Sequence, residues 1–267
     1  MSWIIADAHV HLPSVEHLAS LATSARRNFL RAERRHRLAD AVSRCLFLAD
    51  LRDGTTFAQI RSLAEERRTP SDAFALHPTR EAQAVRLAFH DGCALVLIAA
   101  RQIVTAEAIE VLAIGLTRPY ADGRPLGMVL EDLSREDLLL ILPWGVGKWL
   151  GQRGRIIADA VDGWRGDQLF LGDNGNRPFF WPLPPVFAAG QRGRCRNLPG
   201  SDPLPLAGEE RQAGRCGFWC EGVVDADRPF ASVAALLRDP VTALHPYGAG
   251  ETAYRFCRNQ LLLRLAR

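Results

Sequence analysis

Lysine is almost missing from this chain of 267 residues: Lys148 is the only one, so the formal net charge of +3 comes from arginine. We attribute that bias to genome composition before function. The densest basic stretch lies within residues 26–37, which have helical character and include Glu33. Such a stretch is typical of a solvated helix face. The charge pattern therefore predicts no nucleic-acid partner and no membrane partner.

Paired cysteines are missing as well, since the six cysteines form no Cys-x-x-Cys motif and are too scattered for a small disulfide framework. Reduced thiols are the simplest interpretation, although Cys216 and Cys220 could contribute a ligand or a disulfide. No apolar run is long enough to cross a bilayer, and no basic segment leads into the first apolar run as in a signal peptide. We therefore expect a cytoplasmic protein.

Short apolar runs alternate with helical stretches, the pattern of parallel strands joined by crossover helices. The expected strands are residues 3–6, 44–49, 73–76, 94–104, 110–115, 138–142, 168–172 and 194–198. The expected helices are residues 15–40, 56–66, 155–164, 231–238 and 251–267. An Asp-Gly turn between apolar runs 85–89 and 94–98 predicts one antiparallel hairpin. Length and alternation predict a single α/β domain over residues 1–267, a TIM-like barrel.

The most informative motif stands at the exit of the first expected strand, where Asp7, His9 and His11 follow the apolar residues 3–6. Residues two apart share one face of a strand, so both imidazoles point to the same side. Active sites of α/β barrels form at this end of the strands. The pair therefore predicts a site for a divalent metal ion, with two hydrogen-bonded histidines as the alternative.

Asp202 follows the last expected strand in a Gly-Ser-Asp-Pro turn, and it would meet His9 and His11 at the same face of the barrel. There its carboxylate can bind the metal and accept a proton during hydrolysis. A helix cap or a plain turn is the alternative role.

Two further strand exits carry charged residues beside glycines. Lys148 lies in residues 142–149, where backbone N–H groups and the ammonium can cradle an anionic group, or where tryptophans simply close the barrel rim. The segment lacks the ending of a nucleotide P-loop. Asp173 could add a metal ligand and Arg177 could clamp an anion, with an ordinary Asn-Gly turn as the alternative.

In this order the motifs resemble the PHP family, the polymerase and histidinol phosphatase group of metal-dependent phosphoesterases, which is related to the amidohydrolase barrels. The similar stretches are residues 7–11, 100–105, 110–115, 141–144, 173–175 and 200–204. They are similar, in turn, to the family's opening metal motif, its Gly-x-Glu strand, its His-bearing strand, its His-Pro pair, its Glu-x-x-Asn-Gly element and its closing Ser-Asp-Ala-His. The resemblance implies a distorted (β/α)7-8 barrel of PHP type and phosphoester hydrolysis.

Four positions depart from the family pattern. Gln102 stands at the bridging glutamate, Glu110 near a histidine, Trp144 in the His-Pro pair and Leu204 at the last histidine. An amide, an indole and an alkyl group are poor ligands for a hard cation. A full trinuclear cluster is therefore not expected, and the remaining residues would hold one or two ions.

The sequence predicts a metal-dependent hydrolase with one or two zinc, manganese or iron ions, acting on an anionic small molecule, a phosphoester above all. The candidate metal ligands are His9, His11, Asp202, Glu110 and Asp173. The candidate catalytic residues are Asp202, Lys148 and Arg177, with Arg215 as a further cation. Two alternatives stay open: amide or lactone hydrolysis, and a non-catalytic binding or regulatory barrel that has lost part of its site.

Overall fold

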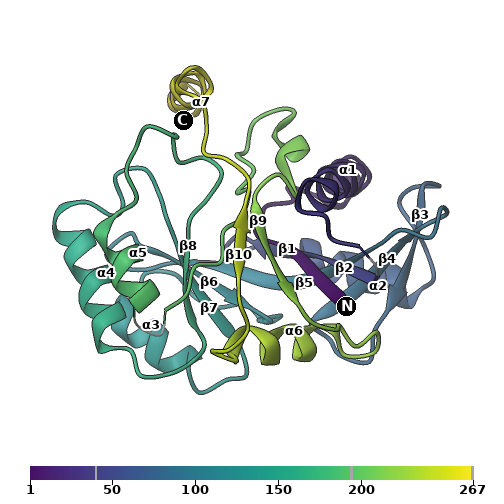
Figure 1. Ribbon diagram of the computed structural model, residues 1–267, viewed down its shortest axis with the longest axis horizontal. Coiled ribbons are helices and arrows are strands. Elements are labelled where there is room, and N and C mark those ends of the chain that lie inside the picture. Colours follow the sequence, from purple (N-terminus) through teal and green to yellow (C-terminus); the bar gives the residue numbers. More distant parts are fainter. Residues whose placement is uncertain (40, 193–194, 266–267) are drawn as a thin grey trace.

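Ten strands frame the computed structural model, which describes residues 1–39, 41–192 and 195–265 (Figure 1). The strands are β1 (Ser2–Val10), β2 (Ala41–Asp50), β3 (Phe74–Pro78), β4 (Ala84–Phe89), β5 (Ala94–Val104), β6 (Glu110–Ile114), β7 (Leu139–Pro143), β8 (Leu169–Gly172), β9 (Gly217–Glu221) and β10 (His245–Tyr247). The helices are α1 (Leu18–His36), α2 (Thr56–Glu65), α3 (Leu126–Leu133), α4 (Gly151–Gly163), α5 (Pro185–Arg192), α6 (Pro229–Arg238) and α7 (Ala253–Leu265). Within these ranges, no helix combines the length and the apolar character that crossing a bilayer requires.

The strands form one mixed sheet in the order β10-β9-β1-β2-β5-β6-β7-β8, with the hairpin β3-β4 attached to β5. The neighbours β1, β2 and β5 run parallel, and so do β7 and β8. Strand β5 is long enough to pair with β4 along its first half and with β6 along its second half, both antiparallel. The antiparallel hairpin expected for residues 85–98 is therefore confirmed: it is formed by β4 and β5. Strand β5 is the central strand of the sheet.

Both faces of the sheet are covered. Strand β7 is buried throughout: Leu139 and Ile141 join the inner core, while Leu140 and Leu142 join an outer core with α3 and α4. A near-continuous apolar run is expected of a strand with two buried faces. The other outer core packs α1 and α2 against β1, β2 and the hairpin. In Figure 1, α3, α4 and α5 gather at one end and α1 and α2 at the other.

Helix α6 fills the inner face of the curled sheet. Its residues Phe230, Val233 and Leu237 belong to the inner core with residues of β1, β5 and β7. A Cβ atom at Gly115, which has a φ of +92°, would lie 2.3 Å from the Phe230 ring. The helix and the sheet can therefore approach closely only because this position is glycine.

The α/β expectation is confirmed, but the sheet is open, with β8 and β10 at its two edges, rather than closed as in a TIM barrel. The expected strand 194–198 is wrong as a regular strand: from Cys195 on, it forms isolated bridges, and Arg194 lies outside the described residues. Leu198 N–H donates to Leu171 O at 2.7 Å, and Ala8 N–H donates to Pro199 O at 3.3 Å. Pro199 has no N–H for a ladder. An irregular segment therefore links β8 to the last residues of β1.

Two strands and two helices are absent from the sequence expectation. Strands β9 and β10 add to the free edge of β1 in antiparallel pairing, in a region we expected to be loop. They are short, and a Cβ at Gly217 would lie 1.9 Å from Ala6 O, so β9 needs a glycine where its backbone meets β1. Helices α3 and α5 are also additional. The expected helix 15–40 ends at His36 because Arg37 adopts a φ of 57°.

An irregularity in β1 decides which face the histidines occupy. Between Asp7 and Val10 the pairing with β2 shifts by one residue, as in a β-bulge. Before the shift, Ala6 lies in the inner core and Ile5 in the outer one, whereas Val10 lies in the outer core after it. The extra residue reverses the alternation, so His9 and His11 emerge on the inner side, and bulges re-aim side chains in this way.

All six cysteines are free, as expected from their spacing. Burial raises the thiol pKa to about 12 for Cys45 and about 11 for Cys195, Cys216 and Cys220, whereas Cys257 is exposed. A thiol reagent should therefore modify Cys257 first in the native protein and the four buried thiols only on unfolding. Ellman titration with and without guanidinium, followed by peptide mapping, checks this. Native-state modification of Cys216 or Cys220 as fast as that of Cys257 would contradict the packing.

Candidate metal centre

Three ligand atoms meet at the carboxyl end of β1. His9 Nε2 and His11 Nε2 are 2.9 Å apart, and each lies 3.5 Å from Asp202 Oδ1. His9 lies in β1 and His11 directly after it, and Asp202 comes from the irregular segment that bonds to both β8 and β1. Within the described ranges, these residues form the one group of three or more His, Cys, Asp or Glu side chains whose ligand atoms lie within 4.8 Å of one another.

A carbonyl oxygen fixes the tautomer of His11. Its Nδ1 lies 2.8 Å from Ala49 O at the end of β2. A carbonyl can only accept, so His11 Nδ1 carries the hydrogen and donates it. In the neutral ring, Nε2 then presents its lone pair to the Asp202 carboxylate and to His9, which is the arrangement found in metal-binding histidines.

His9 is buried, with 4% of its surface exposed. Burial lowers its pKa, and the nearby Asp202 charge partly opposes this, so the neutral imidazole is favoured. Its Nδ1 is buried and has no hydrogen-bond partner among the described residues. The neutral ring is the form that binds a metal ion.

Asp202 is held in a backbone conformation that is uncommon for a non-glycine residue, with a φ of 47°. Its N–H donates to His9 O at 2.8 Å, which ties it directly to β1. Asn174 Nδ2 donates to its Oδ2 at 2.9 Å, and Asn176 Nδ2 donates to its backbone carbonyl at 2.5 Å. The Asn174 amide holds Oδ2, which leaves Oδ1 facing the histidines, and the Asn176 amide holds the backbone of Asp202.

Asp7 is fully buried and ties the strand to two distant loops. Its carboxylate accepts hydrogen bonds from the Ser201 N–H at 2.8 Å, from the Ser201 hydroxyl at 2.5 Å, from the Gly214 N–H at 2.7 Å and from the His9 N–H at 3.2 Å. Burial raises its pKa to about 7, and these four donors limit the rise. Asp7 is therefore a structural centre beside the three candidate ligands.

Gly200 lets that loop approach β1. A Cβ at this position would lie 2.4 Å from His9 N and 2.6 Å from His9 Cβ, distances that real Cβ atoms essentially never show. The close approach requires a glycine, and it sets Ser201 and Asp202 at the end of the strand.

Glu110 and Lys148 pair with each other beside His9. The Lys148 ammonium contacts Glu110 Oε1, to which Gln102 Nε2 also donates at 3.2 Å. The Glu110 charge acts on His9, where it raises the pKa. The expected ligand Glu110 thus lies near the three ligand atoms but outside their 4.8 Å group.

Asp173 and Arg177 form a two-pronged ion pair. Arg177 Nε and Nη2 donate to the two Asp173 oxygens at 2.7 and 2.9 Å, and Nη1 donates to Trp181 O. This geometry raises the pKa of Arg177 and fixes the turn that carries Asn174 and Asn176. Asp173 is likewise outside the group of ligand atoms, and Arg215 lies elsewhere, against Gly175 O and Glu251.

The spacing of the three atoms can be compared with that around a metal ion. Ligands about 2.1 Å from a tetrahedral ion lie about 3.4 Å apart. The two separations of 3.5 Å agree with one such ion, whereas the 2.9 Å between the imidazoles is shorter and is a hydrogen-bond distance, as in the alternative of two hydrogen-bonded histidines. Two nitrogens and one oxygen suit zinc, manganese or iron and do not select among them.

No family model matches the chain, and none of the curated proteins matches its sequence. Among solved structures, PsfC from Pseudomonas syringae PB-5123 has a TM-score of 0.56 at 12% identity, over 100% of this chain and 99% of PsfC. The lesion-specific endonuclease PfuEndoQ from Pyrococcus furiosus has a TM-score of 0.47 at 10% identity, over 91% of this chain and 57% of that one. The likeness to PsfC is one of fold alone.

The exclusion of nucleic acid as a partner needs correction. One neighbour is an endonuclease, which conflicts with that exclusion. The physical reason is that the basic residues 26–37 cover one surface helix and its end, so their charge pattern says nothing about the rest of the surface. The exclusion is therefore withdrawn.

The residues that hold Asp202 in place were not evident from the sequence. Asn174 and Asn176 stood inside a recognised Asn-Gly turn, but nothing in the turn pattern distinguishes an amide that orients a carboxylate from one that caps a loop. The role of Asp7 was missed for a similar reason, since three of its four donors lie in Ser201 and Gly214, about 200 positions away.

Replacing Asp7 by alanine should lower the free energy of unfolding by about 3–5 kcal/mol, because it leaves several buried donors without an acceptor. Urea unfolding followed by circular dichroism checks this. Asp53→Ala, at a carboxylate whose side chain is 91% exposed, is the control and should change stability by less than about 0.5 kcal/mol. Equal effects of the two substitutions would refute the structural role of Asp7.

Proposed function

We propose that the chain is a metal-dependent hydrolase that acts on a phosphoester, with His9, His11 and Asp202 as metal ligands. The observation that supports it most is the convergence of these three ligand atoms within 4.8 Å of one another. The neutral state of His9 and the fixed tautomer of His11 agree with it. The resemblance of the strand-end motifs to the PHP family supports the reaction class.

When bound, a divalent cation would supply Lewis-acid chemistry, polarising a phosphoryl oxygen and making water acidic enough to attack near neutral pH. His9 and His11 would hold that cation and fix its position. Asp202 keeps Oδ1 toward the histidines because Asn174 holds its second oxygen, and Oδ1 can also accept a proton. The inner core around α6 excludes water below the site.

In the proposed reaction, Lys148 supplies the positive charge that faces the substrate. Its ammonium contacts Glu110, and the Glu110 charge in turn acts on His9, so Lys148 lies near the candidate ligands. A phosphoester carries more negative charge than an amide or a lactone, so an ammonium beside the ligands favours phosphoester substrates. Arg177 enters the proposal as a positioning residue, because its ion pair with Asp173 holds the turn of Asn174.

Elemental analysis of protein purified without added metal tests the ligand set. Roughly one or more equivalents of a transition metal are expected in the wild type, and His9→Ala/His11→Ala should lose that metal together with hydrolysis of a chromogenic phosphodiester. His17→Ala, at an exposed histidine that contacts Ser14, is the matched control and should keep both. Absence of metal in the wild type even after exposure to zinc and manganese would refute the proposal.

Lys148→Met should lower kcat/KM toward the phosphodiester by about 10²–10³-fold while the metal content stays unchanged, because a charge that stabilises the transition state is removed and no ligand is lost. Lys148→Arg should restore part of the activity. Steady-state kinetics with parallel metal analysis checks both. A loss of metal in Lys148→Met would assign the residue to the metal centre instead of to the substrate.

A non-catalytic binding protein is the second candidate, and the two ion pairs favour it. Glu110 is engaged by Lys148 and Asp173 by Arg177, so both additional carboxylates are already paired with cations. Such a protein would bind metal through three ligands and turn over none of the phosphoesters, amides or lactones offered. Metal content with turnover separates the two candidates.

A further inference from the structure

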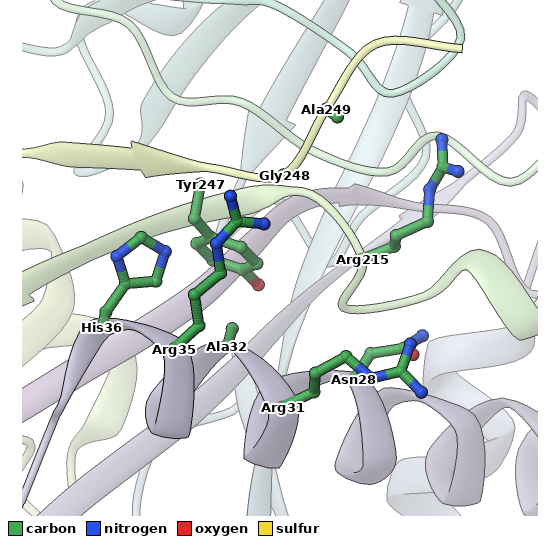
Figure 2. A pocket seen from close by; sticks show the side chains of 9 residues that line it. All are labelled: Asn28, Arg31, Ala32, Arg35, His36, Arg215, Tyr247, Gly248 and Ala249. Atoms are coloured by element: carbon green, nitrogen blue, oxygen red, sulfur yellow. The ribbon is translucent and has the colours of Figure 1, made fainter. Parts of the chain in front are cut away.

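A cavity that shares no residue with the candidate metal centre lies between α1 and the segments that flank β9 and β10. Figure 2 shows its lining, with Arg31 and Arg35 rising from α1 and Arg215 coming from the opposite wall. Its volume is about 200 Å³. Asn28, His36, Tyr247 and Gly248 complete the part of the lining that bears on a ligand.

Positive charge dominates this cavity. Among the carboxylates of the described residues, none lies within 4.0 Å of the Arg31 or Arg35 guanidinium. Arg215 has a distant partner, Glu251 at 3.6 Å, which it shares with Arg255 at 3.4 Å. Two guanidinium groups on successive turns of α1 therefore face a small cavity without a counter-charge.

The surroundings of His36 agree with this. Burial lowers the pKa of His36, and the nearby Arg35 and His245 side chains lower it further. Its ring lies 5.9 Å from the Trp219 ring and 6.3 Å from the Tyr247 ring. The lowered pKa of the His36 imidazole thus indicates a cationic environment, and a bound anion would raise that pKa.

The walls of the cavity are fixed by hydrogen bonds. Asn28 Nδ2 donates to Arg211 O at 3.0 Å and to Ala213 O at 2.8 Å, and Tyr247 Oη donates to Gly214 O at 3.1 Å. At Gly248, with a φ of +100°, a Cβ would lie 2.6 Å from Cys216 Sγ, so this wall requires a glycine. A preformed cavity binds a ligand without first paying the cost of ordering its walls.

We propose that this cavity binds the phosphoryl group of a small molecule, through the guanidinium groups of Arg31 and Arg35 with Arg215 on the opposite wall. Planar guanidinium forks match phosphoryl oxygens in two-pronged hydrogen bonds. The volume is below the roughly 300–1,000 Å³ of drug-sized sites, so it suits a phosphorylated fragment, whereas a polymer or a membrane needs an extended surface. None of the lining residues belongs to the metal-ligand group.

Calorimetric titration of metal-free protein with inorganic phosphate and with glycerol phosphate tests the site and distinguishes the free anion from a phosphate ester. Saturable one-to-one binding of at least one of them is expected. It should weaken by about ten-fold or more in Arg31→Ala/Arg35→Ala, because each lost charge-assisted pair costs affinity. On binding, the pKa of His36, followed by NMR, should rise.

Arg27→Ala/Arg34→Ala is the matched control, since it removes the same charge from the same helix outside the cavity, and it should leave binding unchanged. His9→Ala/His11→Ala should also bind phosphate normally, which separates this site from the metal centre. Equal weakening in both arginine double variants would mean diffuse surface charge and would overturn the proposal. So would the absence of saturable binding, or a preference for oligonucleotides that grows with their length.

Discussion

A single buried carboxylate, that of Asp7, joins the candidate metal centre to the fold. Taking it out of water is costly, and the structure offsets that cost with four donors, two of them from Ser201 and one from Gly214. These donors lie on the loop that spans the open edge of the sheet and on the loop before β9. The same contacts that satisfy Asp7 therefore place Asp202 next to His9, and folding and site assembly become one event.

The bulge in β1 and the glycine at position 200 both determine the position of His9 relative to the neighbouring loop. The bulge turns His9 and His11 toward the inner side, and Gly200 lets the spanning loop come within contact of His9. The sheet is open here, so no regular ladder determines where Asp202 stands. Side-chain amides and the Asp202 N–H bond to β1 do so instead.

That His9, His11 and Asp202 lie close together was predictable, because all three stand at expected strand ends in the sequence. Most of the parallel strands were predictable for the same reason, from apolar runs of strand length. The partners of Glu110 and Asp173 were not, since a carboxylate that binds an arginine or lysine looks the same in sequence as one that binds a metal. Strands β9 and β10 were missed because pairing with β1, not local pattern, makes them strands.

Because Lys148 is the only lysine, its ε-amino group is the only side-chain amine of the chain. It sits against Glu110 at the rim of the candidate metal centre, with about a third of its side chain exposed. An amine-directed fluorophore or crosslinker would consequently attach at one side-chain position, without any engineering of the surface. Because lysine is nearly absent, a fluorophore can be placed on one side chain at the edge of the candidate metal centre, and its fluorescence can then report whether the centre is occupied.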